Sequence, residues 1–173
     1  MANINMNIGK KFYLVLLMIV TIMVLSACND NDRDLMDYSF YNPPDYPIDR
    51  EDFIAAKEAE GFEIMDVSHQ VDFANYVILA IPPSDDYQIE FYEFDTDEDA
   101  SLSFEATRQL LEEVSESSEN YNSVDVANFN RFTIISGDLF AHLHRIGNTM
   151  IFVDWTDLEH RDEISDLLGD FED

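Results

Sequence analysis

The sequence has little cysteine and few basic residues. Its 173 residues include one Cys, and 9 Lys and Arg stand against 37 Asp and Glu, so the formal net charge is −28. A single cysteine excludes a disulfide framework and a cysteine-rich metal site. The shortage of cations excludes a nucleic-acid-binding protein, because contacts to phosphate require a basic surface.

Glycine is also scarce, with five residues in the chain. They form neither a glycine-rich phosphate-binding loop nor the Gly-x-Ser-x-Gly turn of serine hydrolases, which argues against both kinds of site. Hydrophobic residues, by contrast, make up 46% of the chain and aromatic residues 13%. This composition supplies enough apolar surface to order the chain, so we predict one globular domain rather than an acidic disordered segment.

The first 27 residues have the pattern of a signal peptide. Lys10 and Lys11 precede an apolar run over residues 12–25, which is shorter than the about 20 residues that span a bilayer. The run ends at Leu25-Ser26-Ala27-Cys28, which resembles the lipobox of bacterial lipoproteins. The resemblance implies cleavage before Cys28, acylation of that residue and anchoring on the extracytoplasmic side of the cell membrane. The alternative is an uncleaved N-terminal anchor with an incidental cysteine.

Cleavage before Cys28 would remove Lys10 and Lys11 but no acidic residue. The remaining 146 residues would carry 7 Lys and Arg against 37 Asp and Glu, a net charge of −30. We divide them into an acidic, aromatic and proline-containing tether over residues 28–48 and a single domain over residues 49–173. The aromatic residues of the tether either lie on the domain or form a contact strip. The charge keeps the protein soluble, and it also favours a cationic peptide or envelope protein as partner.

The hydrophobic pattern of the domain predicts an α+β fold. We expect an antiparallel sheet built from two α-βββ units and followed by a C-terminal helix, with the helices packed mainly on one face. The expected helices are 50–60, 97–114 and 158–168, with Asp49, Thr96 and Asp157 as their caps. The expected strands are 62–67, 76–81, 87–94, 129–135, 139–145 and 150–154.

Patterns within these elements predict which side chains face water. Alternation along the third strand places Glu90 and Tyr92 on a solvated face. The apolar stripe of the second helix is expected to consist of Leu102, Phe104 or Ala106, Leu110, Leu111 and Val114. Residues 115–123 are rich in Ser, Asn and Glu, so we expect them to form a loop.

Several segments of the domain resemble small lipoproteins of Firmicute bacteria whose function is unknown. The segments are Gly61-Phe62, the strand over 87–94, the hairpin over 145–151 and the closing helix over 162–169. The resemblance implies a lipid-anchored extracytoplasmic domain. Its motifs are structural, so it supplies no catalytic residues.

His142 and His144 are the best candidates for metal ligands. Residues i and i+2 of a strand point to the same side of a sheet, which suits two imidazole ligands. The two-residue turn at Gly147-Asn148 pairs His142 with Val153 and His144 with Ile151, so no third ligand lies opposite them. We therefore expect two satisfied histidines on a half-covered sheet face rather than a metal site.

The same hairpin supplies the candidate binding face. The predicted register brings Phe140 near Trp155, beside His142 and His144. If no helix covers this side of the sheet, the four residues form an aromatic strip within an acidic surface, which is typical of interaction sites.

No constellation of residues indicates catalysis or a cofactor. The acidic run Asp95–Asp99 suggests a calcium loop, but Ala100 and Ala106 occupy the positions that require Gly and a bidentate acid, which favours a helix start. We therefore predict a non-catalytic domain that binds a ligand or protein. Two alternatives stay open, namely a cell-envelope enzyme that acts on wall glycan or peptide and a divalent-cation binder.

Overall fold

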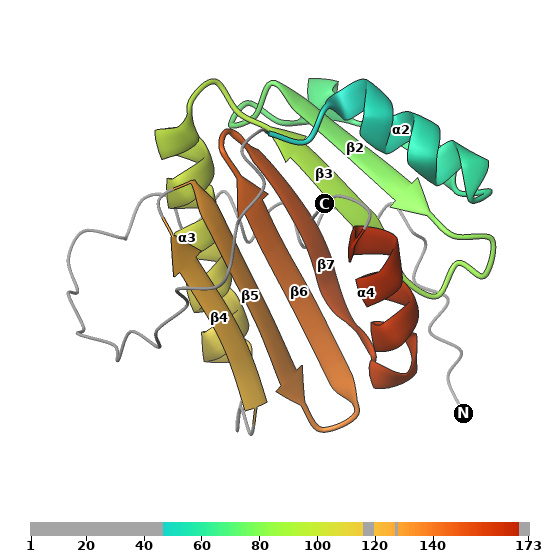
Figure 1. The fold of residues 1–173 in the computed structure, drawn as a ribbon, viewed down its shortest axis with the longest axis vertical. Helices are drawn as coiled ribbons and strands as arrows, with labels where there is room; N and C mark the ends of the chain where they lie inside the picture. Colours follow the sequence, from blue (N-terminus) through green and yellow to red (C-terminus); the bar gives the residue numbers. More distant parts are fainter. Residues whose placement is uncertain (1–46, 116–119, 127, 170–173) are drawn as a thin grey trace. The chain divides into compact units, whose positions relative to one another are not determined.

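The computed structural model describes residues 47–115, 120–126 and 128–169, all of which belong to one compact unit (Figure 1). The helices in these residues are α2 (Arg50–Ala59), η1 (Ser68–Gln70), α3 (Asp97–Val114), η2 (Leu158–His160) and α4 (Arg161–Gly169), where η marks a 3₁₀ helix. The strands are β1 (Glu63–Asp66), β2 (Tyr76–Ile81), β3 (Ile89–Glu93), β4 (Asn120–Val126), β5 (Phe129–Ser136), β6 (Leu139–Ile146) and β7 (Thr149–Asp157).

These strands form a single antiparallel sheet in the order β1-β2-β3-β7-β6-β5-β4. Each half of the sheet is a run of neighbouring strands, and the pairing of β3 with β7 joins the two halves. The α+β class, the antiparallel sheet and the C-terminal helix predicted from the sequence are confirmed.

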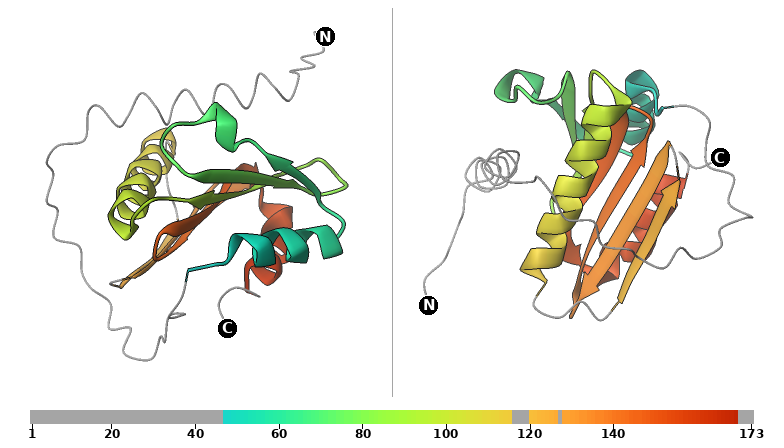
Figure 2. Two further views of the ribbon diagram at one scale, coloured as in Figure 1. Left: turned by 90° about the horizontal axis from the view of Figure 1, so that it is seen from above. Right: turned by 90° about the vertical axis from the view of Figure 1, so that its left-hand side faces the viewer.

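Helices cover both faces of the sheet (Figure 2). The helix α3 lies against β5, β6 and β7 on one face, whereas α2 and α4 lie on the other. On the α2 and α4 face, Phe53 of α2 and Ile164 of α4 share one buried cluster with Phe91 and Ile151 of the central strands. Two of the three α-helices in the described residues thus share a face, and the domain has the layered packing that buries both sides of a sheet.

The helix starts follow the local signals in the sequence. Asp49 Oδ1 accepts hydrogen bonds from the backbone N–H groups of Glu51 (2.8 Å) and Asp52 (3.1 Å), and Thr96 Oγ1 accepts one from Asp99 (3.1 Å). These bonds satisfy N–H groups that have no partner within the helix. Both predicted caps are confirmed.

The C-terminal part of the fold differs from the sequence prediction in two places. The expected loop over 115–123 is wrong from Asn120 onward, because Asn120–Val126 forms the edge strand β4 and pairs along its whole length with β5. The expected cap at Asp157 is also wrong. Asp157 ends β7, and its side chain makes no capping hydrogen bond to the 3₁₀ turn that follows.

The prediction of a solvated face on β3 is also wrong. Glu90 and Tyr92 are each only 2% exposed. Phe73, from the loop after η1, packs against the ring of Tyr92 with centroids 6.0 Å apart. Both sides of β3 are therefore covered, and the alternation of polar and apolar residues does not indicate a solvent-exposed face in this strand.

The buried stripe of α3 agrees with the expected one only in part. Leu102 is 65% exposed and Val114 is 58% exposed. Phe104 and Leu111 of the expected stripe are buried, together with small residues. The small residues let α3 approach the sheet closely, and the stripe therefore runs through Ala100, Ser103 and Thr107 as well.

Candidate functional site

The hairpin of β6 and β7 has the predicted register around its two histidines. His142 pairs with Val153 and His144 pairs with Ile151. Further from the turn, an irregularity between Phe140 and His142 shifts the pairing by one residue, so Phe140 lies opposite Thr156. The predicted register therefore does not extend to Phe140, because β7 carries an extra residue there.

The four residues of the candidate binding face do not form an exposed strip. Phe140 and His144 are each 1% exposed, and His142 and Trp155 are half-buried. Phe140 belongs to the buried cluster that includes Phe53 of α2, because α2 and α4 pack on this side of the sheet. A partner that approaches the folded domain therefore cannot use Phe140 or His144 as a contact.

The two histidines are not satisfied in the way the sequence suggested. His142 Nδ1 lies 2.9 Å from Thr133 Oγ1, but His142 Nε2 and both ring nitrogens of His144 are buried without a hydrogen-bond partner. The rings of His144 and Phe129 pack edge to face, with their centroids 4.8 Å apart. Burial, with a smaller effect of Arg131, lowers the pKa of His142 to about 4. Burial, followed by His142 and Arg131, lowers the pKa of His144 to about 3.

In the part of the chain that the structure describes, this histidine pair has no third metal ligand beside it. Among the described residues, no third His, Cys, Asp or Glu lies close enough to share an ion with His142 and His144. Arg131 pairs directly with His144 across the β5–β6 ladder, and its positive charge opposes a cation at that position. The rings are neutral side chains of the core.

A buried acidic group lies on the opposite face of the sheet, where sequence reasoning had placed no site. Glu90 accepts hydrogen bonds from the hydroxyl of Tyr92 and the side-chain amide of Gln88. Burial raises the pKa of Glu90 to about 7, the two hydrogen bonds oppose this rise, and the nearby Asp154 adds to it. Such a carboxyl is tuned for proton transfer, but at 2% exposure it lies out of reach of an external substrate.

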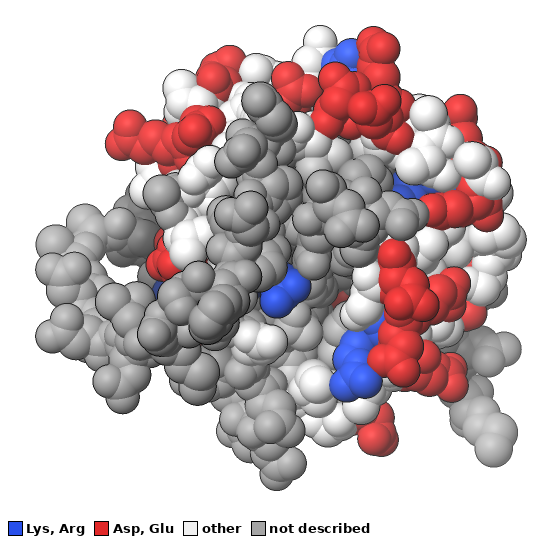
Figure 3. Space-filling view, in the orientation of Figure 1, with Lys and Arg blue, Asp and Glu red and all other residues white. Residues whose placement is uncertain are grey.

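The exposed face of α2 and α4 gathers acidic side chains. The two helices are joined by Lys57, whose buried Nζ donates to the carbonyl oxygen of Leu167 in α4 (2.9 Å) and to Glu60 (2.9 Å). Figure 3 shows acidic side chains over the part of the molecule where both helices lie. We call this region the α2–α4 surface and define it by its exposed acids, which are Glu51, Asp52, Glu58, Asp162, Glu163 and Asp166.

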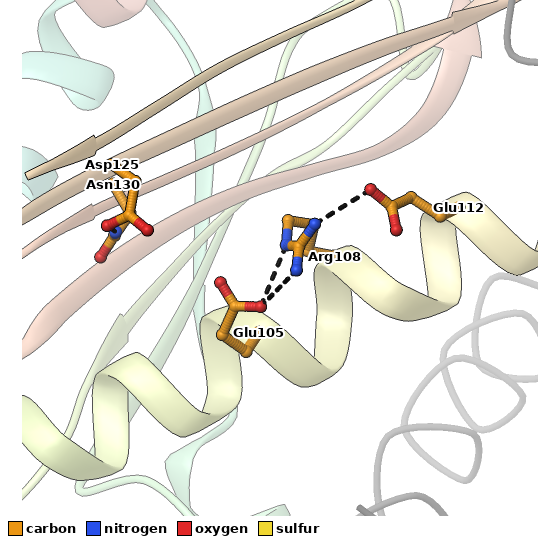
Figure 4. Close-up of polar contacts among 5 residues, drawn as sticks. All are labelled: Glu105, Arg108, Glu112, Asp125 and Asn130. Carbon is orange, nitrogen blue, oxygen red and sulfur yellow. Dashed lines mark hydrogen bonds and ion pairs between the residues drawn. The ribbon is translucent and has the colours of Figure 1, made fainter. Parts of the chain in front are cut away.

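The few cations of the domain are occupied by contacts within the chain. Three of the nine Lys and Arg residues and ten of the 37 Asp and Glu residues lie outside the described ranges, which leaves 6 cations against 27 acids. Arg108 of α3 pairs with Glu105 (2.6 Å) and Glu112 (3.0 Å), as Figure 4 shows. Arg161 pairs with Asp162 (2.8 Å), so the α2–α4 surface keeps most of its negative charge uncompensated.

The sequence alone does not reveal this surface. The sequence predicts α2 and α4 as separate helices, and nothing in their spacing places their acids on one surface. The contact of Lys57 with Leu167 and the core that the two helices share bring these acids onto one surface.

Neither Cys28 nor comparison with known proteins adds information about the site. Cys28, the expected site of lipidation, lies outside the described residues. None of the described helices combines the length and the apolar composition that a membrane crossing needs. Neither the protein-family models nor the curated proteins nor the solved structures gave a match to this chain.

Proposed function

We propose that this chain is a lipid-anchored extracytoplasmic lipoprotein whose α+β domain binds a cationic peptide or envelope protein without catalysis. The observation that carries the proposal is the α2–α4 surface, where two neighbouring helices present acids that the chain's own cations leave uncompensated. The anchoring half of the proposal comes from Leu25-Ser26-Ala27-Cys28.

The physical argument rests on the field of the domain. An excess of 27 acids over 6 cations creates a negative potential that extends into solvent over about one Debye length, near 8–10 Å at physiological salt. Such a field raises the association rate of a cationic partner. It also repels anionic lipid headgroups, so an acylated Cys28 would hold a domain that faces away from the membrane.

The site does not support catalysis as its main role. Burial shifts the pKa values of Glu90 and the nearby Asp154 and, on the other face of the sheet from Glu90, those of His142 and His144. Glu90 and His144 are only 2% and 1% exposed. A catalytic acid and base must reach the same substrate. The described residues therefore favour binding by the exposed surface over chemistry in the interior.

A capture experiment with matched variants tests this function. The full chain in a nonionic detergent is used to capture proteins from a native envelope extract, and the same is done with Glu58→Gln/Asp166→Asn on the α2–α4 surface. The control is Glu98→Gln/Glu113→Gln, which removes two exposed charges from α3 instead. We expect a basic partner that is lost from the first variant and retained by the control.

Salt distinguishes this mode of binding from an apolar contact. A partner held by the field should be released as salt rises from ~0.05 to ~0.5 M, because the Debye length falls well below 10 Å. Binding that is indifferent to salt, or that is weakened equally by the α3 control, would contradict a cationic partner on the α2–α4 surface.

A further inference from the structure

Three metal-ligating side chains converge on the turn between β7 and α4. One ligand atom each from Asp157, Glu159 and His160 lies within 4.8 Å of the others. Asp157 is the last residue of β7, and the other two belong to the 3₁₀ turn η2. Leu158 fixes the start of this turn through its backbone N–H, which donates to the carbonyl oxygen of Asp138 (2.7 Å).

The imidazole of His160 is held in place by packing rather than by hydrogen bonds. Its side chain is 16% exposed, and its ring lies 5.3 Å from the ring of Tyr87. Neither ring nitrogen makes a hydrogen bond with a described residue. Nε2 lies 3.9 Å from Glu159 Oε1 and Nδ1 lies 3.8 Å from Glu163 Oε2. The hydroxyl of Tyr87 donates to the other oxygen of Glu163 (3.1 Å), so the same tyrosine positions both side chains.

We propose that Asp157, Glu159 and His160 bind a divalent first-row transition metal, with Zn²⁺ as the best fit. The donor set decides the class of metal. Calcium and magnesium prefer oxygen ligands alone, whereas one imidazole with carboxylates suits zinc and its neighbours. Ligand atoms around one tetrahedral zinc ion lie roughly 3.3 Å apart at bond lengths near 2.0–2.2 Å. The ligand atoms lie within 4.8 Å of one another, so binding requires the exposed side chains of Asp157 and Glu159 to rotate toward His160.

The local charge favours a cation in spite of the helix that follows. The N-terminus of α4 carries the equivalent of roughly +0.5 elementary charge, which disfavours a metal ion nearby. Asp157 and Glu159 bring two negative charges to the group, and Glu163 contacts the imidazole from the first turn of α4. The carboxylates outweigh the helix end, and the nearest cation of the turn, Arg161, is paired with Asp162. The metal site does not require the cationic partner proposed above.

Calorimetric titration of untagged full chain with zinc chloride tests the site. The titration is run in nonionic detergent with ~0.15 M salt and with excess Ca²⁺, which occupies sites made of carboxylates alone. We expect one zinc ion per chain in the presence of Ca²⁺. His160→Gln should weaken binding at least about tenfold, the scale on which even supporting residues of metal sites act.

Matched variants keep the outcome interpretable. His69→Gln removes an exposed histidine elsewhere, and Asp166→Asn removes an acid of α4 outside the group, so both should bind zinc as the unaltered chain does. Circular dichroism checks that each variant is folded, and Asp157→Asn replaces His160→Gln if the latter is not. Zinc binding at Cys28 would survive in His160→Gln. The proposal is overturned if the chain binds no zinc in the presence of Ca²⁺, or if folded His160→Gln binds it as tightly as His69→Gln does.

Discussion

At the scale of single residues, Glu90 shows how the fold changes the chemistry of a side chain. In the sequence it is one of 37 acids and sits at a position that alternation assigns to water. In the structure it is 2% exposed, and the burial raises its pKa to about 7. Sequence alone cannot reveal this, because the covering residues, such as Phe73 over Tyr92, come from a loop that is distant in the chain.

We predict that Glu90→Gln stabilises the domain at alkaline pH. The pKa of Glu90 is about 7 in the folded chain and 4.5 in the unfolded chain. Its contribution to stability is therefore fully present below pH 4.5 and is lost as pH rises through about 7. Glutamine keeps the shape without the charge, so the variant should gain on the order of 3 kcal/mol over the unaltered chain at pH 8 and little at pH 4.5. Urea unfolding at both pH values measures this difference.

The control is Glu93→Gln on the same strand, a half-buried position with no hydrogen bond of the kind that Glu90 accepts. It should change the free energy of unfolding similarly at the two pH values. An equal gain for both variants at pH 8 would mean that reduced net charge, and not the burial of Glu90, is responsible.

At the scale of elements, local signals predicted most of the fold. The caps at Asp49 and Thr96 and the turn at Gly147-Asn148 depend on residues close in the chain, and all three are confirmed. The strand β4 depends on a partner instead. Its sequence, NYNSVDV, has the composition of a loop, and its hydrogen bonds to β5 make it a strand. Tertiary pairing overrides weak propensity in this way at sheet edges.

The turn of the β6–β7 hairpin gives a prediction at this scale. Gly147 has φ +55°, and a Cβ atom added there would lie 3.0 Å from Cγ of Pro47. Gly147→Ala should cost roughly 1–2 kcal/mol for the left-handed backbone and about 1–3 kcal/mol more for the crowding. The loss is measured as the free energy of urea unfolding.

The control for crowding is Gly137→Ala in the preceding turn. Gly137 has φ +61°, and an added Cβ would meet no heavy atom within 4 Å. This variant should therefore cost only the backbone strain. If the two substitutions cost the same, contact between Pro47 and the hairpin does not contribute to stability.

At the scale of the whole molecule, the sequence and the structure locate different parts of the candidate function. The lipobox can be identified from four adjacent residues. The α2–α4 surface forms only when two helices that lie far apart in the chain pack together. The group at Asp157, Glu159 and His160 has short spacing in the sequence. The sequence pattern predicts a helix cap at Asp157 and does not show that His160 lies close to it.

We predict that Cys28→Ala abolishes membrane anchoring and leaves the domain folded. The domain from Pro47 onward has its own buried core, and attachment of a lipid requires the sulfur of Cys28. Membrane fractionation with metabolic labelling of acyl chains measures anchoring, and circular dichroism of the released chain measures folding. Ser26→Ala is the control, since a small residue there preserves the lipobox. Persistent acylation of Cys28→Ala would contradict the lipobox interpretation.

The whole domain should also lose stability in acid because of the two buried histidines. The pKa of His142 is about 4 and that of His144 about 3 in the folded chain, against 6.5 in the unfolded chain. The unfolded chain therefore binds protons first, and stability falls as pH drops below 6.5. By pH 5 the loss is on the order of 2 kcal/mol for each histidine. Glu90 acts with the opposite sign, so these three groups together favour an optimum near neutrality or slightly below it.

Substitution of His144 by leucine tests whether this histidine causes the loss of stability in acid. Both nitrogens of His144 are buried without a hydrogen-bond partner, so an apolar side chain of similar size removes two unsatisfied groups and the group that titrates. We expect His144→Leu to be at least as stable as the unaltered chain at pH 7.5 and to lose about 2 kcal/mol less on transfer to pH 5. The exposed His69→Leu should lose as much as the unaltered chain does. If His144→Leu keeps the full acid loss in urea unfolding, other groups of this acidic domain govern its stability below neutrality.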